Sequence, residues 1–233
     1  MQLSDLHAFV INVPKELFRY MNFRENTKTV PLKIECMSAV PICKCTQKAY
    51  VKTLKRYKEV SQELTICKII KVAKDNGYKN VLIFEDDAEC RCSAERFEEI
   101  ISQIPDNFDV CYLGAYIRAI SGNGYFTKVS KDLIKFNGSG FNIWGMHAII
   151  INEKHYDTVF NFLIDNKRNT LSDRFMSNMV NQKFKNALLV TQPIFFQSAK
   201  LNSKDLKSLH NTNFNFKELE TTHLKKVLSK IKK

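Results

Sequence analysis

Short runs dominated by apolar residues recur along this chain, and they constrain its fold more than any other feature. The clearest are residues 7–13, 81–84 and 108–113. Each run is too short for a buried helix and lacks regular polar alternation, which is typical of a strand covered on both faces. The segments between them have helical periodicity, and Gly77 and Pro105 stand where two of those helices end. This alternation predicts an α/β fold, with a mostly parallel mixed sheet flanked by helices.

The remaining elements continue this order. Further expected helices lie at residues 15–20, 47–58, 62–75, 93–104, 153–164 and 171–181, and further strands at 30–36, 125–130, 133–136, 145–151, 187–190 and 194–196. We expect one domain over residues 1–203 and a basic helical tail over residues 204–233. In sheets of this kind ligands bind beyond the carboxyl ends of the strands, so the residues after positions 13, 84 and 113 are the first candidates for a site.

The composition is that of a globular protein in a reducing compartment. Hydrophobic residues make up 44% of the 233 residues, and 17 Phe and 8 Tyr supply enough apolar surface for a core. No apolar run approaches the roughly 20 residues of a membrane span, and the first residues lack the pattern of a signal peptide. The 7 cysteines include no Cys-x-x-Cys spacing and are interpreted as reduced thiols. The close pairs Cys43/Cys45 and Cys90/Cys92 are awkwardly spaced for a disulfide or a shared tetrahedral metal. We therefore expect a cytoplasmic protein.

The net charge of +12 comes from two segments. Residues 44–79 carry +7 and residues 201–233 carry +5, so the rest of the chain is neutral. Basic patches suit nucleic acid, an anionic membrane or a phosphorylated ligand, although Lys-rich helices are more often simply solvated. In the tail, one helical face carries Leu224, Val227, Leu228 and Ile231, with lysines around it. This pattern predicts either a helix packed on the domain or a basic amphipathic helix in peripheral contact with a membrane surface.

Four carboxylates within five residues follow the apolar run at 81–84. They are Glu85, Asp86, Asp87 and Glu89. Side chains alternate along a strand, so Glu85 and Asp87 should lie on one side and Asp86 on the other. Such a cluster needs a cation or basic groups to compensate its charge, and hard oxygen ligands suit Mg²⁺ or Mn²⁺. We interpret it as a metal site; the alternative is an acidic cap for the helix that starts near Ser93.

The apolar strand that ends in Glu85-Asp86-Asp87 resembles the Asp-x-Asp-type motif of nucleotide-sugar glycosyltransferases with the GT-A (Rossmann-like) fold. More closely, the chain from about residue 9 to residue 203 resembles glycosyltransferase family 25, the group of bacterial lipooligosaccharide and collagen galactosyltransferases. The other segments that carry this resemblance are, in chain order, Phe9-Val10-Ile11-Asn12-Val13, Phe108-Asp109-Val110-Cys111-Tyr112-Leu113-Gly114, Trp144-Gly145-Met146-His147-Ala148, Ser172-Asp173-Arg174-Phe175 and Pro193 to Gln197. The family's Gly-rich helix with a Ser-His pair is not matched, because residues 62–67 read Gln-Glu-Leu-Thr-Ile-Cys.

The resemblance implies roles for the residues at the ends of two strands. Asp87 is the expected direct metal ligand. Glu85 and Asp86 are expected to orient the metal site or to bind the ribose of the nucleotide. Asn12 and Arg19, beyond the first strand, are expected to contact the base or a phosphate of the nucleotide. The alternative for Arg19 is an exposed helical arginine.

Two further residues, His147 and Asp173, receive roles from the resemblance. His147, on the strand expected at 145–151, would complete the metal site, and the alternative is a core or rim histidine. Asp173 would be the general base that takes the proton of the acceptor hydroxyl. The alternative for Asp173 is a capping role, because Thr170 and Asp173 stand in the Thr-x-x-Asp spacing of a helix start.

These expectations combine into a metal-dependent hexosyltransferase. It would move a sugar, with inversion, from a nucleotide-diphosphate sugar, in the first place a UDP-sugar, to a hydroxyl of a glycan, glycolipid or protein. Mn²⁺ or Mg²⁺ is the expected cofactor, and no nucleic acid partner is expected. A metal-dependent phosphodiesterase or nuclease stays open, although the sequence lacks a second cluster of acids and His for a two-metal site. A catalytically silent nucleotide-sugar-binding relative stays open as well.

Overall fold

The computed structural model describes residues 1–42, 54–165, 172–198, 223, 225–227 and 229–232. Its helices are α1 (Leu17–Asn26), α3 (Leu54–Asp75), α4 (Ala94–Ser102), α5 (Tyr156–Asp165) and α6 (Ser172–Gln182), with short 3-10 helices η1 (Leu3–Asp5) and η2 (Glu153–His155). Its strands are β1 (Leu6–Asn12), β2 (Ile34–Ser38), β3 (Asn80–Glu85), β4 (Ala88–Cys90), β5 (Val110–Ile120), β6 (Tyr125–Lys128), β7 (Leu133–Asn137), β8 (Phe141–Asn152), β9 (Ala187–Val190), β10 (Phe195–Gln197) and β11 (Ile231–Lys232).

Nine of the described strands form one sheet, in the order β11-β6-β7-β9-β5-β8-β3-β1-β2. β2, β1 and β3 are parallel to one another, and so are β5 and β9. β8 joins these two groups by running antiparallel to both β3 and β5. Across the whole sheet, seven of these nine strands run the same way, and β7 and β8 run against them. The predicted α/β fold with a mostly parallel mixed sheet is confirmed.

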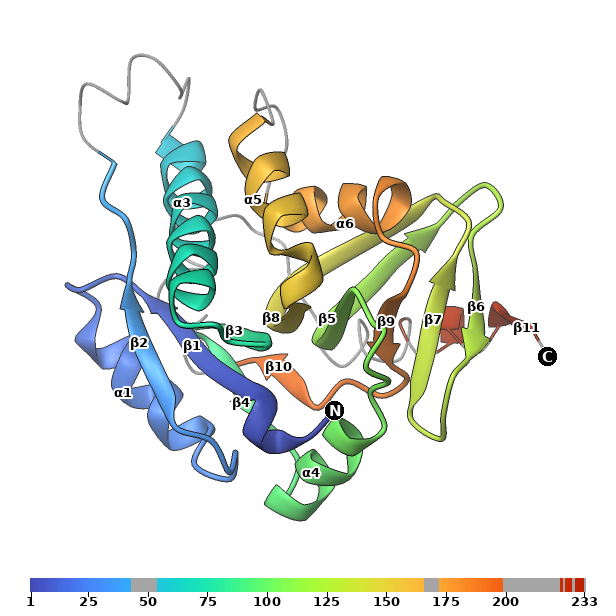
Figure 1. Ribbon diagram of the computed structural model, residues 1–233, viewed down its shortest axis with the longest axis horizontal. Coiled ribbons are helices and arrows are strands. Elements are labelled where there is room, and N and C mark those ends of the chain that lie inside the picture. Colours follow the sequence, from blue (N-terminus) through green and yellow to red (C-terminus); the bar gives the residue numbers. More distant parts are fainter. Residues whose placement is uncertain (43–53, 166–171, 199–222, 224, 228, 233) are drawn as a thin grey trace, which may run out of the picture.

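Helices cover both faces of this sheet (Figure 1). On one face α3, α5 and α6 pack over a core that joins Ile70 of α3 to Ile83 of β3. On the other face α1 and α4 supply Phe23 and Phe97, which pack with Phe84 of β3. Successive residues of β3 thus enter opposite cores, which explains why its sequence is an unbroken apolar run.

α3 is a single helix where the sequence pattern predicted two, at residues 47–58 and 62–75. It runs unbroken from Leu54 to Asp75. Residues 59–61, which read Glu-Val-Ser, contain neither Gly nor Pro, so nothing forces the helix to end there. Ser61 uses its hydroxyl within the helix to donate to the carbonyl oxygen of Val40 at 2.6 Å. The first part of the predicted helix, residues 47–53, lies outside the described residues.

The described end of the chain packs on the domain. Residues 223, 225–227 and 229 are helical, and β11 then adds to the sheet beside β6. Val227 is fully buried, and Ile231 packs against the same core. These contacts support the interpretation of a packed tail, but Ile231, predicted on the apolar face of the tail helix, lies in the strand β11. None of the described helices is long and apolar enough to cross a membrane. The boundary after residue 203 falls outside the described residues and stays a prediction, as does contact with a membrane surface.

Replacing Phe84 should destabilise the fold more than any change on the surface of α1. Its ring is fully buried, with ring centroids 5.5 Å from Phe23 and 5.0 Å from Phe195. Phe84→Ala should lower the free energy of unfolding by about 3–5 kcal/mol, measured by urea denaturation. Phe18→Ala is the control, because Phe18 is 73% exposed and should change stability by less than about 0.5 kcal/mol. Equal losses in the two variants would contradict this account of the core.

Candidate metal and nucleotide site

The acidic cluster lies where β3 ends, and its side chains divide between the two faces of the sheet. Glu85, the last residue of β3, accepts a hydrogen bond from Gln62 of α3 at 2.8 Å. Asp86 instead accepts hydrogen bonds from Arg19 of α1, on the other face. This is the division that strand alternation predicted for these two neighbours. The acidic cap is wrong, because Ser93 caps α4 by accepting from the amide of Arg96.

Both oxygens of Asp86 are occupied by protein donors. Oδ1 accepts from Arg19 Nε at 2.9 Å and Nη2 at 2.5 Å, and Oδ2 accepts from Asn12 Nδ2 at 2.8 Å. Arg19 Nη2 also reaches Asp87 Oδ2, at 3.4 Å. Asp86 therefore fixes the positions of Arg19 and Asn12, and Arg19 is half-buried and ion-paired rather than the freely exposed helical arginine of the alternative.

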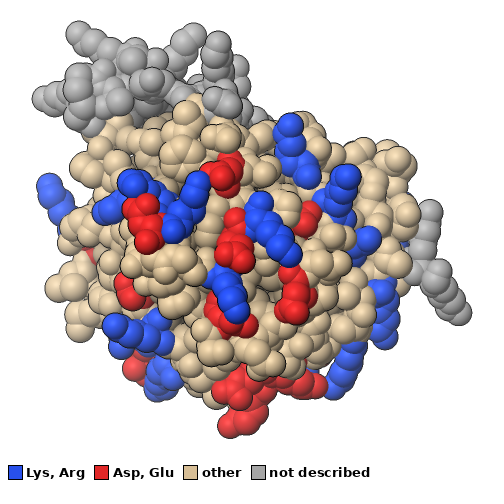
Figure 2. Space-filling model, in the orientation of Figure 1, with Lys and Arg blue, Asp and Glu red and all other residues tan. Residues whose placement is uncertain are grey.

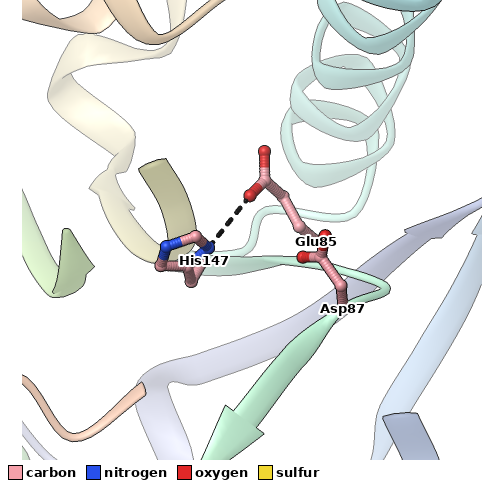
Figure 3. A group of neighbouring side chains, drawn as sticks. All are labelled: Glu85, Asp87 and His147. Atoms are coloured by element: carbon pink, nitrogen blue, oxygen red, sulfur yellow. Dashed lines mark ion pairs between the residues drawn. The ribbon is translucent and has the colours of Figure 1, made fainter. Parts of the chain in front are cut away.

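Glu85, Asp87 and His147 form a compact group of metal-ligating side chains. One ligand atom from each lies within 4.8 Å of the others. His147 comes from β8, which is paired with β3, and its Nδ1 lies 3.2 Å from Glu85 Oε2 (Figure 3). The family resemblance assigned these three residues to one metal site, with Asp87 as the direct ligand, and the structure brings the three side chains together. The alternative, a histidine of the core, explains why His147 is only 4% exposed. It does not explain why two carboxylates lie beside the imidazole.

The chemistry of this group fits a divalent cation. Asp87 Oδ2 accepts from Gln197 at 3.1 Å, but Oδ1 is buried and accepts no hydrogen bond within the described part of the chain. Buried carboxylate oxygens normally have a partner, so Oδ1 is available for a cation. Three carboxylates face the single charge of Arg19, which leaves two negative charges when His147 is neutral. Two carboxylates and one imidazole suit Mn²⁺ and neighbouring first-row ions at least as well as Mg²⁺.

The two carboxylates of the group differ in pKa. Burial acts to raise the pKa of Glu85, but the hydrogen bond and charge of His147, with a hydrogen bond from Gln62, bring it below its usual value. Burial, and then the charge of Glu85, raise the pKa of Asp87. The protein alone therefore disfavours the charged form of Asp87, and a bound cation would favour that form.

A β-bulge in β8 places His147 against this group. Gly114 of β5 pairs with Ala148, but Tyr116 pairs with Trp144, so three residues of β8 lie opposite one of β5. Gly145, inside the bulge, has φ +75°. A Cβ at this position would lie 2.5 Å from His147 Nε2. The glycine is thus required both by its backbone conformation and by the closeness of the imidazole.

Several contacts of the site were not anticipated from the sequence. Gln62 and Gln197 bind the acidic side chains, and Gly145 sets the place of His147. Gln197 ends a segment that carries the family resemblance but received no role from it, and no local pattern marks Gln62, because each glutamine meets its carboxylate only through the packing of α3 and β10. Asp173 lies in α6, but its side chain is outside the described part of the structure, so its role stays a prediction, and so does the Thr170 cap.

No family model matches the chain, and no curated protein matches it. Among solved structures, it is similar to a glycosyltransferase involved in the glycosylation of the major capsid of PBCV-1. The TM-score is 0.53 at 8% identity, over 88% of this chain and 99% of that chain. The chain therefore shares the fold of that glycosyltransferase. Two weaker matches have a TM-score of 0.40 and support no argument: A197 from STIV (12% identity, 84% of this chain and 83% of that chain) and mannose-1-phosphate geranyltransferase from Thermus thermophilus (10% identity, 80% and 73%).

Adding a methyl group at Gly145 should displace His147. Gly145→Ala should lower the affinity for Mn²⁺ and so reduce the rise in melting temperature that Mn²⁺ causes. Gly77→Ala is the matched control, because Gly77 has φ +64° but nothing lies within 4 Å of its added Cβ. Both variants bear the cost of a left-handed residue, about 1–2 kcal/mol, and only the first disturbs the site. A Mn²⁺ response that is the same in both variants would show that Gly145 does not position His147.

Proposed function

We propose that this protein is a metal-dependent glycosyltransferase that moves a sugar from a nucleotide-diphosphate sugar to an acceptor hydroxyl. The group of Glu85, Asp87 and His147 at the carboxyl end of β3 carries the proposal. The fold shared with the PBCV-1 glycosyltransferase supports it. In sheets of this kind ligands bind beyond the carboxyl ends of the strands, which is where the group lies.

The side chains around the group suit a diphosphate leaving group. A divalent cation held by Glu85, Asp87 and His147 would supply Lewis-acid stabilisation of the diphosphate as the glycosidic bond breaks. Arg19, 3.4 Å from Asp87, adds a fixed positive charge on the α1 side of the same site. Asp86 Oδ1 accepts a hydrogen bond from that guanidinium. The Arg19 side chain is therefore already oriented before a substrate binds.

The finer assignments are parts of this proposal. We place the protein near family 25, with a UDP-hexose as donor and a hydroxyl of a glycan, glycolipid or protein as acceptor. Asp173 is the proposed base of an inverting reaction. Asn12 and Arg19 are the proposed nucleotide contacts. Mn²⁺ is favoured over Mg²⁺ because His147 contributes a nitrogen ligand.

The nuclease alternative is weaker than the transferase. Among the described residues, Glu85, Asp87 and His147 are the one group of three or more potential ligands, so a second metal has no comparable site there. On the face in Figure 2, Lys and Arg are interspersed with Asp and Glu rather than gathered into a basic stripe. Incubation with a panel of nucleotide sugars and Mn²⁺ separates the classes. Transfer or hydrolysis of the sugar supports the transferase, cleavage of oligonucleotides supports a nuclease, and binding without turnover supports a silent relative.

Removing the carboxylate of Asp87 should abolish metal-dependent donor binding while the fold stays intact, because Asp87 lies in the turn after β3. With Mn²⁺ and a UDP-sugar at a hundred times the dissociation constant, the parent should gain about 2.7 kcal/mol of stability. Asp87→Asn should gain almost none in the same thermal-shift titration. Glu89→Gln, which changes a nearby acid ion-paired with Arg91, should respond like the parent. An Asp87→Asn variant that responds like the parent would overturn the metal assignment.

Asp173 should act on the acceptor and not on the donor. Asp173→Asn should keep Mn²⁺–nucleotide binding but lose transfer by on the order of 10²–10⁴, the usual contribution of a general base. Comparing the rate of sugar transfer with the dissociation constant of the nucleotide measures the two effects separately. If the rate stays unchanged and only the melting temperature falls, the helix-capping alternative is correct.

A further inference from the structure

Two thiols meet at the end of β4, the strand that follows the three consecutive carboxylates. Cys90, the last residue of β4, and Cys92 have their Sγ atoms 3.6 Å apart, and Cys90 Sγ also lies 3.7 Å from the carbonyl oxygen of Cys92. The sequence spacing alone made this pair look awkward for a shared bond. In the structure, Cys92 lies in a bend directly after β4, and the two sulfurs are in contact there.

Cys90 differs from the other described cysteines in its readiness to ionise. The hydrogen bond with the Cys92 thiol, opposed by burial, lowers the pKa of Cys90 to about 6, and a hydrogen bond with the backbone of Cys92 and one with the side chain of Thr29 act in the same direction as the thiol. Burial raises the pKa of Cys67 to about 12 and also raises that of Cys111. At neutral pH, therefore, the thiolate that a reactive cysteine needs is present at Cys90.

We propose that Cys90 and Cys92 form a dithiol site that a peroxide oxidises to an intramolecular disulfide. The Cys90 thiolate attacks one oxygen of hydrogen peroxide, the O–O bond breaks, and the released hydroxide takes a proton to leave as water. Cys90 is then a sulfenic acid. The sulfur of Cys92 attacks the sulfur of Cys90, the S–O bond breaks, and a second water leaves with the proton of Cys92. Two thiols have lost two electrons and two protons, and one peroxide has become two waters.

The disulfide would act on Asp87 through β4 and β10. Cys90 pairs with Phe195 of β10, and the residues that follow hold Asp87: Gln197 donates to its Oδ2 at 3.1 Å, and the amide of Ser198 donates to its carbonyl oxygen at 2.7 Å. Closing the sulfur–sulfur distance from 3.6 Å to about 2.05 Å would pull on Cys90, and through Cys90 on the pairing of β4 with β10. Loss of such supporting contacts typically lowers metal affinity about 10–100-fold. This consequence rests on the proposed metal site, whereas the disulfide itself does not.

The test uses the full chain with Cys43 and Cys45 replaced by Ser, so that the other Cys-x-Cys pair cannot react. Treatment with hydrogen peroxide should remove two alkylatable thiols and lower the intact mass by two hydrogen atoms, with peptide mapping placing the bond between Cys90 and Cys92. Dithiothreitol should reverse both changes. Adding Cys92→Ser should stop the reaction at a Cys90 sulfenic acid, which dimedone traps. Adding Cys36→Ser, which removes an exposed thiol elsewhere, should leave the disulfide unaffected.

Mn²⁺ titration of the reduced and oxidised protein then separates the two proposals. The expected result is Mn²⁺ binding that weakens about 10–100-fold on oxidation and recovers on reduction. If both thiols remain alkylatable after peroxide, or if Cys90 only gains oxygen atoms, the dithiol proposal is overturned, whatever the metal result. If the disulfide forms but the reduced protein binds no Mn²⁺, the metal site is wrong and the dithiol stands. If the disulfide forms and Mn²⁺ affinity is unchanged, the coupling through β4 and β10 is wrong.

Discussion

The excess of negative charge at the end of β3 is the constraint on which the rest of the site depends. Three consecutive carboxylates stand at the end of a strand that is buried on both faces, and they differ in how far the protein compensates their charge. Asp86 is neutralised by Arg19, and Glu85 is stabilised by His147 and Gln62. Asp87 keeps a buried oxygen that accepts no hydrogen bond among the described residues. A sheet with helices on both faces makes this possible, because it brings donors from α1 and α3 to opposite sides of one strand end.

Because side chains alternate along a strand, neighbouring residues of the acidic cluster have different partners and different roles. Asp86 points toward α1 and uses both oxygens to bind Arg19 and Asn12, so it acts as a support for cationic and amide groups. Its neighbours Glu85 and Asp87 lie close to His147. That histidine comes from β8, which pairs antiparallel with β3. A shift of one residue in the register of β3 would exchange these roles, so the continuous apolar core on both faces also fixes the chemistry of the strand end.

The fold class, the acidic cluster and its division between two faces were predictable, because apolar runs and alternation are local properties of the sequence. The contacts that complete the site were not. Gly145 is needed because a bulge brings His147 within reach of its Cβ position, and the sequence does not show where β5 and β8 lose register. The three-residue strand β4 is too short to show a period, so neither its pairing with β10 nor the contact between Cys90 and Cys92 could be predicted. The unbroken course of α3 shows the same limit, since the sequence pattern predicted two helices there.

The region around His223 also contributes to the surroundings of the proposed metal site. His223 is 1% exposed, and its Nδ1 accepts a hydrogen bond from the amide of Ile117 at 2.9 Å, next to the bulged part of β5. The ring of Tyr116 lies between the two histidines, with centroids 6.2 Å from His223 and 5.7 Å from His147. Burial lowers the pKa of His223 to about 4, so at neutral pH its imidazole is uncharged and can act as an acceptor. Because that pKa lies below the unfolded value of about 6.5, the stability that His223 contributes is present above this value and is lost as the pH falls toward 4. His223, more than seventy residues beyond His147, therefore packs against the ring of Tyr116, which in turn contacts the imidazole of His147. Because His223 is neutral, it adds no charge next to a site that already has an excess of negative charge.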